Sequence, residues 1–309
     1  MIRFYSPGMD HDRLFKELLT TFFFEFLELF FPALIGCIDR SQAPIFLDKE
    51  SFGQSKRRRE VDLVVRLKMN GQDTHFLVHV EHQAQARGGF PGRMHRYFSR
   101  LVEKFGHPVY PIALFSFPEP LTKQPDRYQM TVAGRRVLDF RYAALQLNRM
   151  NWRHFARQAN PVASALMARM NIPARERARV KLQCLRLLST LALDRKKSHL
   201  ISDFVDSYLQ LDAAEVRIFK RSLEKLPQEE RREIMQITNS WKEEGRIEGL
   251  AEGRNEGLVE GLLEGLETAL ELKFGPPARS LILRMQNYSL DELQELRRKL
   301  LDGAQLDGL

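Results

Sequence analysis

Two apolar runs rich in β-branched residues, Val61-Asp62-Leu63-Val64-Val65-Arg66-Leu67 and Phe76-Leu77-Val78-His79-Val80-Glu81-His82-Gln83, flank the pair Asn70-Gly71. An Asn-Gly pair between such runs is a strong local signal for a β-hairpin. A two-residue turn at this pair would place Asp62 directly opposite His79. The sequence therefore predicts two antiparallel strands in this register.

The two faces of the predicted hairpin differ in polarity, because side chains alternate along a strand. One face is apolar and carries Val61, Leu63, Val65, Leu67, Phe76, Val78 and Val80. The other face carries Glu60, Asp62, Val64, Arg66, Leu77, His79, Glu81 and Gln83. In the expected register Asp62 and Glu81 are diagonal neighbours, with backbones roughly 7–8 Å apart. Two converging carboxylates repel unless a proton or a cation lies between them, so this face predicts a divalent metal site.

A second interpretation of the polar face stays open. An antiparallel sheet with one solvated face shows the same alternation without binding anything. Oxygen ligands suit Mg²⁺ or Mn²⁺, which bind through one or two carboxylates together with waters and substrate phosphates. The residues are therefore compatible with phosphodiester hydrolysis, and equally with simple exposure to solvent.

Five sequence blocks occur in a recognisable order. They are His11-Asp12-Arg13-Leu14-Phe15-Lys16-Glu17-Leu18-Leu19, Arg59-Glu60-Val61-Asp62-Leu63, Val78-His79-Val80-Glu81-His82-Gln83, Arg93-Met94-His95-Arg96-Tyr97-Phe98 and Val109-Tyr110-Pro111-Ile112-Ala113-Leu114-Phe115. Together they resemble the Rpn family of bacterial recombination-promoting nucleases, whose members are often labelled transposases. Within them, Asp62 and Glu81-His82-Gln83 are similar to the PD-(D/E)xK nuclease signature, with glutamine in place of its lysine. The resemblance extends over most of the chain.

This resemblance implies an α/β fold with a PD-(D/E)xK-like αβββαβ core and a C-terminal helical extension. It also implies a Mg²⁺-dependent endodeoxyribonuclease, linked to DNA recombination or to mobile elements. Asp62 and Glu81 match the metal-binding acids, Glu17 matches the acid on the helix before the sheet, and Gln83 takes the third motif position. A neutral glutamine orients water by hydrogen bonds but does not supply the charge of lysine. We therefore expect catalysis to depend on water activated by Mg²⁺ or Mn²⁺, with slow or metal-selective turnover.

Basic residues lie on both sides of the predicted carboxylate site. Arg93, Arg96 and Arg100 recur at spacings of three and four, so they share one face of a helix expected over about residues 91–105. Two cationic patches around acidic residues predict a phosphate clamp whose affinity for DNA falls as salt rises; a solvated basic surface is the alternative. The candidate nucleic-acid contacts are Lys56, Arg57, Arg58, Arg59, Arg87, Arg93, Arg96 and Arg100.

Composition sets broad limits on this interpretation. The 309 residues are 43% hydrophobic and 28% charged, which is typical of a globular protein, and the net charge of +8 favours polyanionic partners. Cys37 and Cys184 have no metal-ligand spacing, so neither zinc nor a disulfide is expected. The run 22–36 is rich in Phe and Leu but is interrupted by Glu25 and Glu28 and is too short to cross a bilayer. We expect it to pack on the apolar sheet face, with no membrane partner and a cytoplasmic location.

The chain is expected to have four parts. Residues 1–160 form the nuclease-like core, 161–240 a helical bundle, 241–265 a Gly-Glu repeat, and 266–309 a small helical module whose last helix starts at the capping box Ser289-Leu290-Asp291-Glu292. Glycine recurs at every fourth position from Gly245 to Gly265, and each glycine costs a helix roughly 1 kcal/mol relative to alanine. The repeat is therefore a flexible spacer, or a helix that joins copies of the chain into a homo-oligomer.

Three functional classes follow. The first is a metal-dependent DNA endonuclease. The second is a DNA-binding protein with a degenerate nuclease site. The third is an oligomeric interaction protein that acts through the C-terminal repeat.

Overall fold

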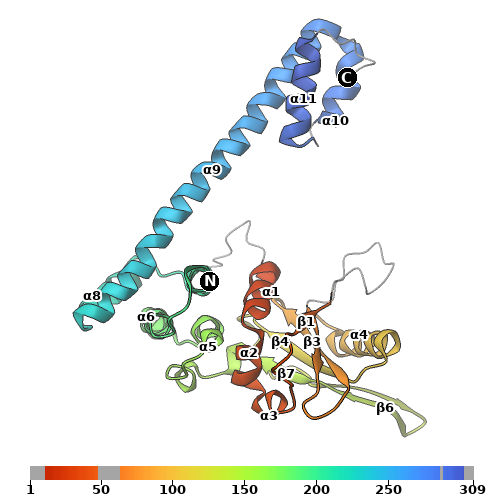
Figure 1. Cartoon of the computed structure of the whole chain (residues 1–309), viewed down its shortest axis with the longest axis vertical. Helices are drawn as coiled ribbons and strands as arrows, with labels where there is room; N and C mark the ends of the chain where they lie inside the picture. The colour runs from red at the N-terminus through yellow and green to blue at the C-terminus, as the bar shows by residue number, and fades with distance from the viewer. Residues whose placement is uncertain (1–10, 48–62, 286–287, 303–309) are drawn as a thin grey trace. The chain divides into compact units, whose positions relative to one another are not determined.

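The computed structural model describes residues 11–47, 63–285 and 288–302 (Figure 1), and it describes side-chain surroundings there except at 11–12 and 239–256. The chain divides into two compact units, Met1–Ile237 and Thr238–Leu309. The first unit is a mixed α/β structure and the second is helical.

A five-stranded mixed sheet forms the centre of the first unit, in the order β1-β2-β3-β4-β7. Its strands are β1 (Ile45–Phe46), β2 (Leu63–Lys68), β3 (His75–Gln83), β4 (Val109–Phe115) and β7 (Ala143–Gln146). The first three strands are antiparallel, whereas β3, β4 and β7 are parallel neighbours. Up to β4 the described elements follow the order of three helices, three strands, one helix and one strand.

The predicted hairpin is present as β2 and β3, but its predicted register is wrong by two residues. His79 pairs with Val64 rather than with Asp62, which lies outside the described residues. Because the shift is even, the described residues keep the faces that the alternation assigns to them.

The register differs because the turn is longer than two residues. The Met69 amide donates to the Thr74 carbonyl at 2.9 Å, so residues 70–73 form the loop. A two-residue type I′ turn needs positive φ at both central positions. Gly71 has φ +70°, but Asn70 is not among the residues with positive φ. The Asn-Gly pair therefore lies at the start of a four-residue loop.

Helices cover both faces of the sheet. Figure 1 shows α1 (His11–Thr21) and α2 (Phe23–Phe30) on one side and α4 (Phe90–Phe105) on the other. On the first side the Phe15 ring stacks on His82, with 3.9 Å between ring centroids. On the second, Tyr97 and Leu101 of α4 join a buried cluster with residues of β2 and β3. The face predicted to be polar is thus covered by α4, and a fully solvated face is the wrong interpretation for its described part.

The run 22–36 forms α2 and the short α3 (Pro32–Ile35). Phe23, Phe26 and Leu27 of α2 are buried, as expected for a helix packed on the apolar sheet face. Among the residues that the structure describes, no helix has the length and apolarity that a membrane span requires.

A second hairpin is formed by β5 (Arg127–Val132) and β6 (Arg135–Arg141). Ala133 and Gly134 both have positive φ, at 47° and 77°, as a two-residue turn of this hand requires. The hairpin packs on α4 through ring contacts of His95 with Tyr128 and Phe140.

Helical segments follow the sheet within the same compact unit. They are η2 (Leu147–Arg149), η3 (Trp152–His154), α5 (Pro161–Leu166), η4 (Met167–Arg169), η5 (Ala174–Glu176), α6 (Arg177–Ser189), α7 (Arg195–Tyr208) and α8 (Ala213–Glu224). Phe204 and Tyr208 of α7 contact the ring of Phe15, so α7 packs on α1. The predicted helical bundle therefore shares its core with the sheet.

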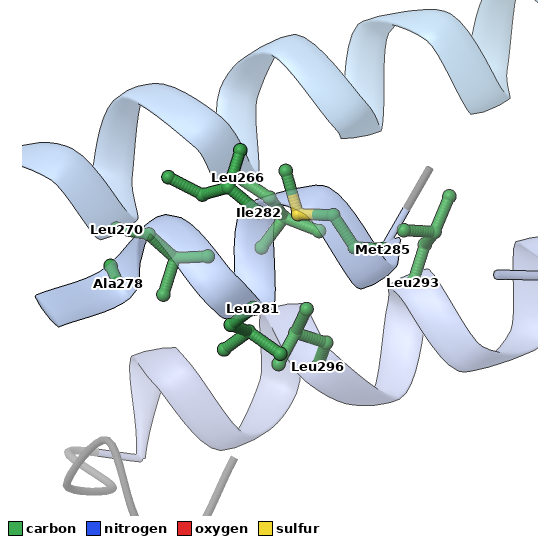
Figure 2. Close-up of a cluster of buried hydrophobic side chains, with 8 residues drawn as sticks. All are labelled: Leu266, Leu270, Ala278, Leu281, Ile282, Met285, Leu293 and Leu296. Atoms are coloured by element: carbon green, nitrogen blue, oxygen red, sulfur yellow. The ribbon is translucent and has the colours of Figure 1, made fainter. Parts of the chain in front are cut away.

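The glycine repeat lies within one long helix, α9 (Gln228–Phe274), so its backbone is helical rather than that of a flexible spacer. In the second unit η6 (Pro276–Ala278), α10 (Arg279–Met285) and α11 (Leu290–Leu301) follow α9. Figure 2 shows how Leu266 of α9, Leu281 of α10 and Leu296 of α11 meet in one apolar cluster. Ser289 forms the predicted capping box with Glu292, which begins α11.

Candidate functional site

Glu81 is the predicted site residue whose surroundings are described most fully. It lies on β3, on the face covered by α4, and is only 3% exposed. Its Oε1 lies 3.4 Å from Nε of Arg93, and its Oε2 lies 3.6 Å from Nε2 of His79. The Arg93–Glu81 separation is that of an ion pair rather than of a well-formed hydrogen bond. The carboxylate is therefore buried between two nitrogen-bearing side chains.

Both neighbours of Glu81 depend on α4 for their positions. His79 is fully buried, and its ring lies edge-on to that of Tyr97 with 5.9 Å between centroids. Arg93 comes from the first turn of α4, and its guanidinium carbon lies 5.0 Å from the centre of the Phe90 ring. A buried carboxylate loses its hydration and needs compensating charge. Arg93 supplies that charge, so a metal ion at Glu81 would compete with it.

Gln83 follows on the same strand face and is half-buried. Its side-chain amide nitrogen donates to the His82 carbonyl at 2.7 Å. His82 points to the opposite face, where Nε2 lies 2.7 Å from Oγ of Ser116 and the ring stacks on Phe15. These contacts give His82 a structural role on the sheet face that α1 covers.

The remaining predicted acids are not joined to Glu81 by any described contact. Glu17 is exposed on α1, whose buried residue Phe15 covers the opposite sheet face. Asp62 lies outside the described residues, as does the basic run Lys56, Arg57, Arg58 and Arg59. Over 11–47, 63–285 and 288–302, no three His, Cys, Asp or Glu side chains form a cluster suited to a metal ion.

The predicted basic residues that the structure describes differ in their exposure to solvent. Arg96 and Arg100 are exposed on α4, and exposed Arg87 donates to Oε1 of Gln85 at 3.2 Å in the loop before the helix. Arg93 is turned inward, with 17% of its side chain exposed. Sequence reasoning treated it as a surface phosphate contact and missed its ion pair with Glu81. The spacing of four from the buried Tyr97 was the available signal, because it places Arg93 at the border of the buried helix face.

If α4 forms the DNA interface that the sequence predicts, the double substitution Arg96→Gln, Arg100→Gln should weaken DNA binding and lower its salt dependence. Each lost phosphate contact reduces the slope of log K against log salt by about 0.9, so the pair should reduce it by about 2. Fluorescence anisotropy with duplex DNA over a salt series measures this slope. The matched control is Arg217→Gln, Arg221→Gln, which removes the same charge from exposed positions on α8. An equal loss in both double variants would count against an interface on α4.

Comparisons of this chain with models of protein families, with curated proteins and with solved structures found no significant match.

Proposed function

We propose that the protein is a metal-dependent DNA endonuclease that hydrolyses phosphodiester bonds, with Mg²⁺ or Mn²⁺ held at Glu81. The main support is the buried Glu81 carboxylate on β3, next to a helix that presents Arg96 and Arg100 to solvent. The element order from α1 to β4, with β3 and β4 parallel, agrees with a PD-(D/E)xK-like αβββαβ core. We propose recombination or mobile-element biology as the setting, on the sequence resemblance alone.

The donor chemistry fits such an ion. Mg²⁺ takes one or two protein carboxylates and completes its shell with waters and phosphate oxygens. Glu81 would be one ligand, and Asp62 is proposed as the second on sequence grounds. When bound, the ion would supply charge that stabilises the developing phosphate oxyanion and favours ionisation of water.

The protein side chains would orient the reactants. Gln83 would position the attacking water through its amide group, whose nitrogen now donates to the His82 carbonyl. Arg96 and Arg100 would bind DNA phosphates near the candidate site. A cation held at Glu81 would compete with Arg93 for the carboxylate. Glu17 is proposed to support the site from the helix that precedes the sheet.

The test is incubation of the full-length protein with supercoiled plasmid in Mg²⁺ or Mn²⁺, with EDTA added in parallel. We expect nicking that requires the metal and stops with EDTA. Nicking that continues in EDTA would contradict metal-dependent hydrolysis.

A DNA-binding protein with a degenerate nuclease site is the second candidate. It is favoured by Gln83 in the motif's lysine position and by the ion pair that already compensates Glu81. Its signature would be salt-dependent DNA binding that Arg96→Gln, Arg100→Gln weakens, without nicking in either metal.

We also propose that the C-terminal region joins copies of the chain into a homo-oligomer. A Cβ atom added to Gly257, Gly261 or Gly265 would meet no atom within 4 Å. This part of the glycine repeat on α9 therefore has space for a second helix. Small residues at such spacing let a second helix approach closely.

Removal of residues 241–309 is expected to reduce the number of chains per particle while leaving Mn²⁺ binding unchanged, because Glu81 lies in the first unit. Light scattering coupled to size-exclusion chromatography measures the mass. Gly261→Leu in the full-length chain should also reduce the number of chains per particle. Leucine fills the space beside the glycine repeat and has a higher helix propensity than glycine. A truncated protein with the same number of chains per particle would exclude this role.

A further inference from the structure

An arginine-rich cleft lies in the first unit, away from the Glu81 site. It has a volume of about 750 Å³ and is formed by η3 with the turn after it, by one face of α6, and by the start of α9. Gln183 of α6 donates to the Ala156 carbonyl at 2.9 Å, which fastens the turn to the helix. The charged residues that line the cleft are Arg153, Arg157, Arg179, Arg186 and Glu230.

The lining carries more positive charge than its carboxylates compensate. Arg186 forms a bidentate pair with Glu230, at 2.5 and 3.3 Å, and Arg153 pairs with Glu176. Burial opposes ionisation of Glu176, but hydrogen bonds from Arg153 and Trp152 lower its pKa below the usual value. The Glu176 carboxylate is therefore expected to be ionised near neutral pH.

Two of the arginines that line the cleft are not paired with a carboxylate of any described residue. Within the described part of the chain, Arg157 and Arg179 have no ion-pair partner, although both line the cleft. They come from different elements, the turn after η3 and α6. Guanidinium groups placed on two walls of one hollow favour an anion that both can contact.

Trp152 holds part of this cationic wall in place. It is 3% exposed, and its ring centre lies 4.7 Å from the guanidinium carbon of Arg153 and 5.9 Å from that of Arg179. Its Nε1 donates to Oε2 of Glu176 at 3.2 Å, which fixes the ring. Such cation–π contacts restrict the side chains before any ligand arrives. Because the indole is buried, it is not available to stack on a nucleobase.

We propose that this cleft binds a small phosphate-bearing molecule of nucleotide size, recognised through its phosphate groups. Arginine presents planar paired donors that match phosphate oxygens. The volume lies within the range of about 300–1,000 Å³ that is typical of small-molecule sites. A nucleic-acid strand is less well matched, because its bases would need aromatic surfaces for stacking. This assignment does not depend on DNA cleavage by the protein.

The test uses the full chain and the fact that it contains two tryptophans, Trp152 and Trp241. Trp241→Phe leaves Trp152 as the only indole reporter, and its fluorescence is followed during titration with pyrophosphate and with ADP. We expect saturable binding of both probes. Calorimetry on the unsubstituted chain provides the same affinities without relying on the reporter.

The double substitution Arg157→Gln, Arg179→Gln is expected to weaken both probes by at least about tenfold, since each lost charge-assisted hydrogen bond contributes that much. The control Arg217→Gln, Arg221→Gln removes equal charge outside the cleft, and circular dichroism checks that each variant is folded. Failure of both probes to bind, or an equal loss in the control, would overturn the proposal. Binding of a short single-stranded oligonucleotide, without binding of ADP or pyrophosphate, would also overturn it.

Discussion

Replacement of Glu81 by glutamine is expected to slow metal-dependent plasmid cleavage by at least about a hundredfold, because a bound metal contributes several kcal/mol to transition-state stabilisation. Glutamine keeps the size of the side chain and removes its charge. The rate is the initial loss of supercoiled plasmid at saturating Mg²⁺. Asp62→Ala is expected to cause a loss of similar size if Asp62 is the second ligand.

Glu103→Gln is the matched control for Glu81→Gln. It makes the same chemical change at an exposed position on α4 and is expected to leave the rate unchanged. Thermal melting must accompany the rates, because Arg93 and His79 lose their buried carboxylate neighbour in Glu81→Gln. Cleavage at equal rates by Glu81→Gln, the control and the unmodified protein would assign the activity to another site or to a contaminant.

Phe15→Ala is expected to destabilise the first unit by about 3–5 kcal/mol, the usual cost of removing a fully buried aromatic ring. Phe15 is 0% exposed. Its ring stacks on His82 at 3.9 Å and meets Phe204 edge-on at 4.8 Å. Loss of this ring removes the contact that joins α1 to both the sheet and α7. Urea unfolding followed by circular dichroism measures the change.

Leu121→Ala is the control for this substitution, since Leu121 is 55% exposed and its truncation should change stability by less than about 0.5 kcal/mol. Equal urea midpoints for Phe15→Ala and Leu121→Ala would show that α1 does not cover this sheet face.

Local sequence signals predicted much of the framework. Alternation along β2 and β3 assigned the described side chains to the correct faces. Ser289 with Glu292 located the start of α11. These features depend on neighbouring residues, so they can be recognised without knowledge of the tertiary structure.

Two features of the sheet were not predicted, one of them local and the other dependent on a distant segment. The loop of residues 70–73 shifted the register, although the Asn-Gly pair alone favoured a shorter turn. β7 pairs in parallel with β4 across an intervening hairpin, and nothing in its four residues predicts that partner.

The candidate sites also combine features that the sequence predicts with features that it does not. Alternation placed Glu81 on the correct face, but its burial between His79 and Arg93 follows from the docking of α4 on the sheet. The cleft brings Arg157, Arg179 and Glu230 together from separate parts of the chain, so the spacing of its arginines did not predict it.

Direct binding of Mn²⁺ to the full-length protein tests the central claim that Glu81 holds a divalent cation. Electron paramagnetic resonance of free Mn²⁺ gives the affinity without DNA and without any contribution from a contaminating nuclease. We expect the unmodified protein and Glu103→Gln to bind Mn²⁺ alike, and Glu81→Gln to bind at least about tenfold more weakly, since substitutions in the outer shell alone cost 10–100-fold. Equal Mn²⁺ affinity in Glu81→Gln and the unmodified protein would contradict the account.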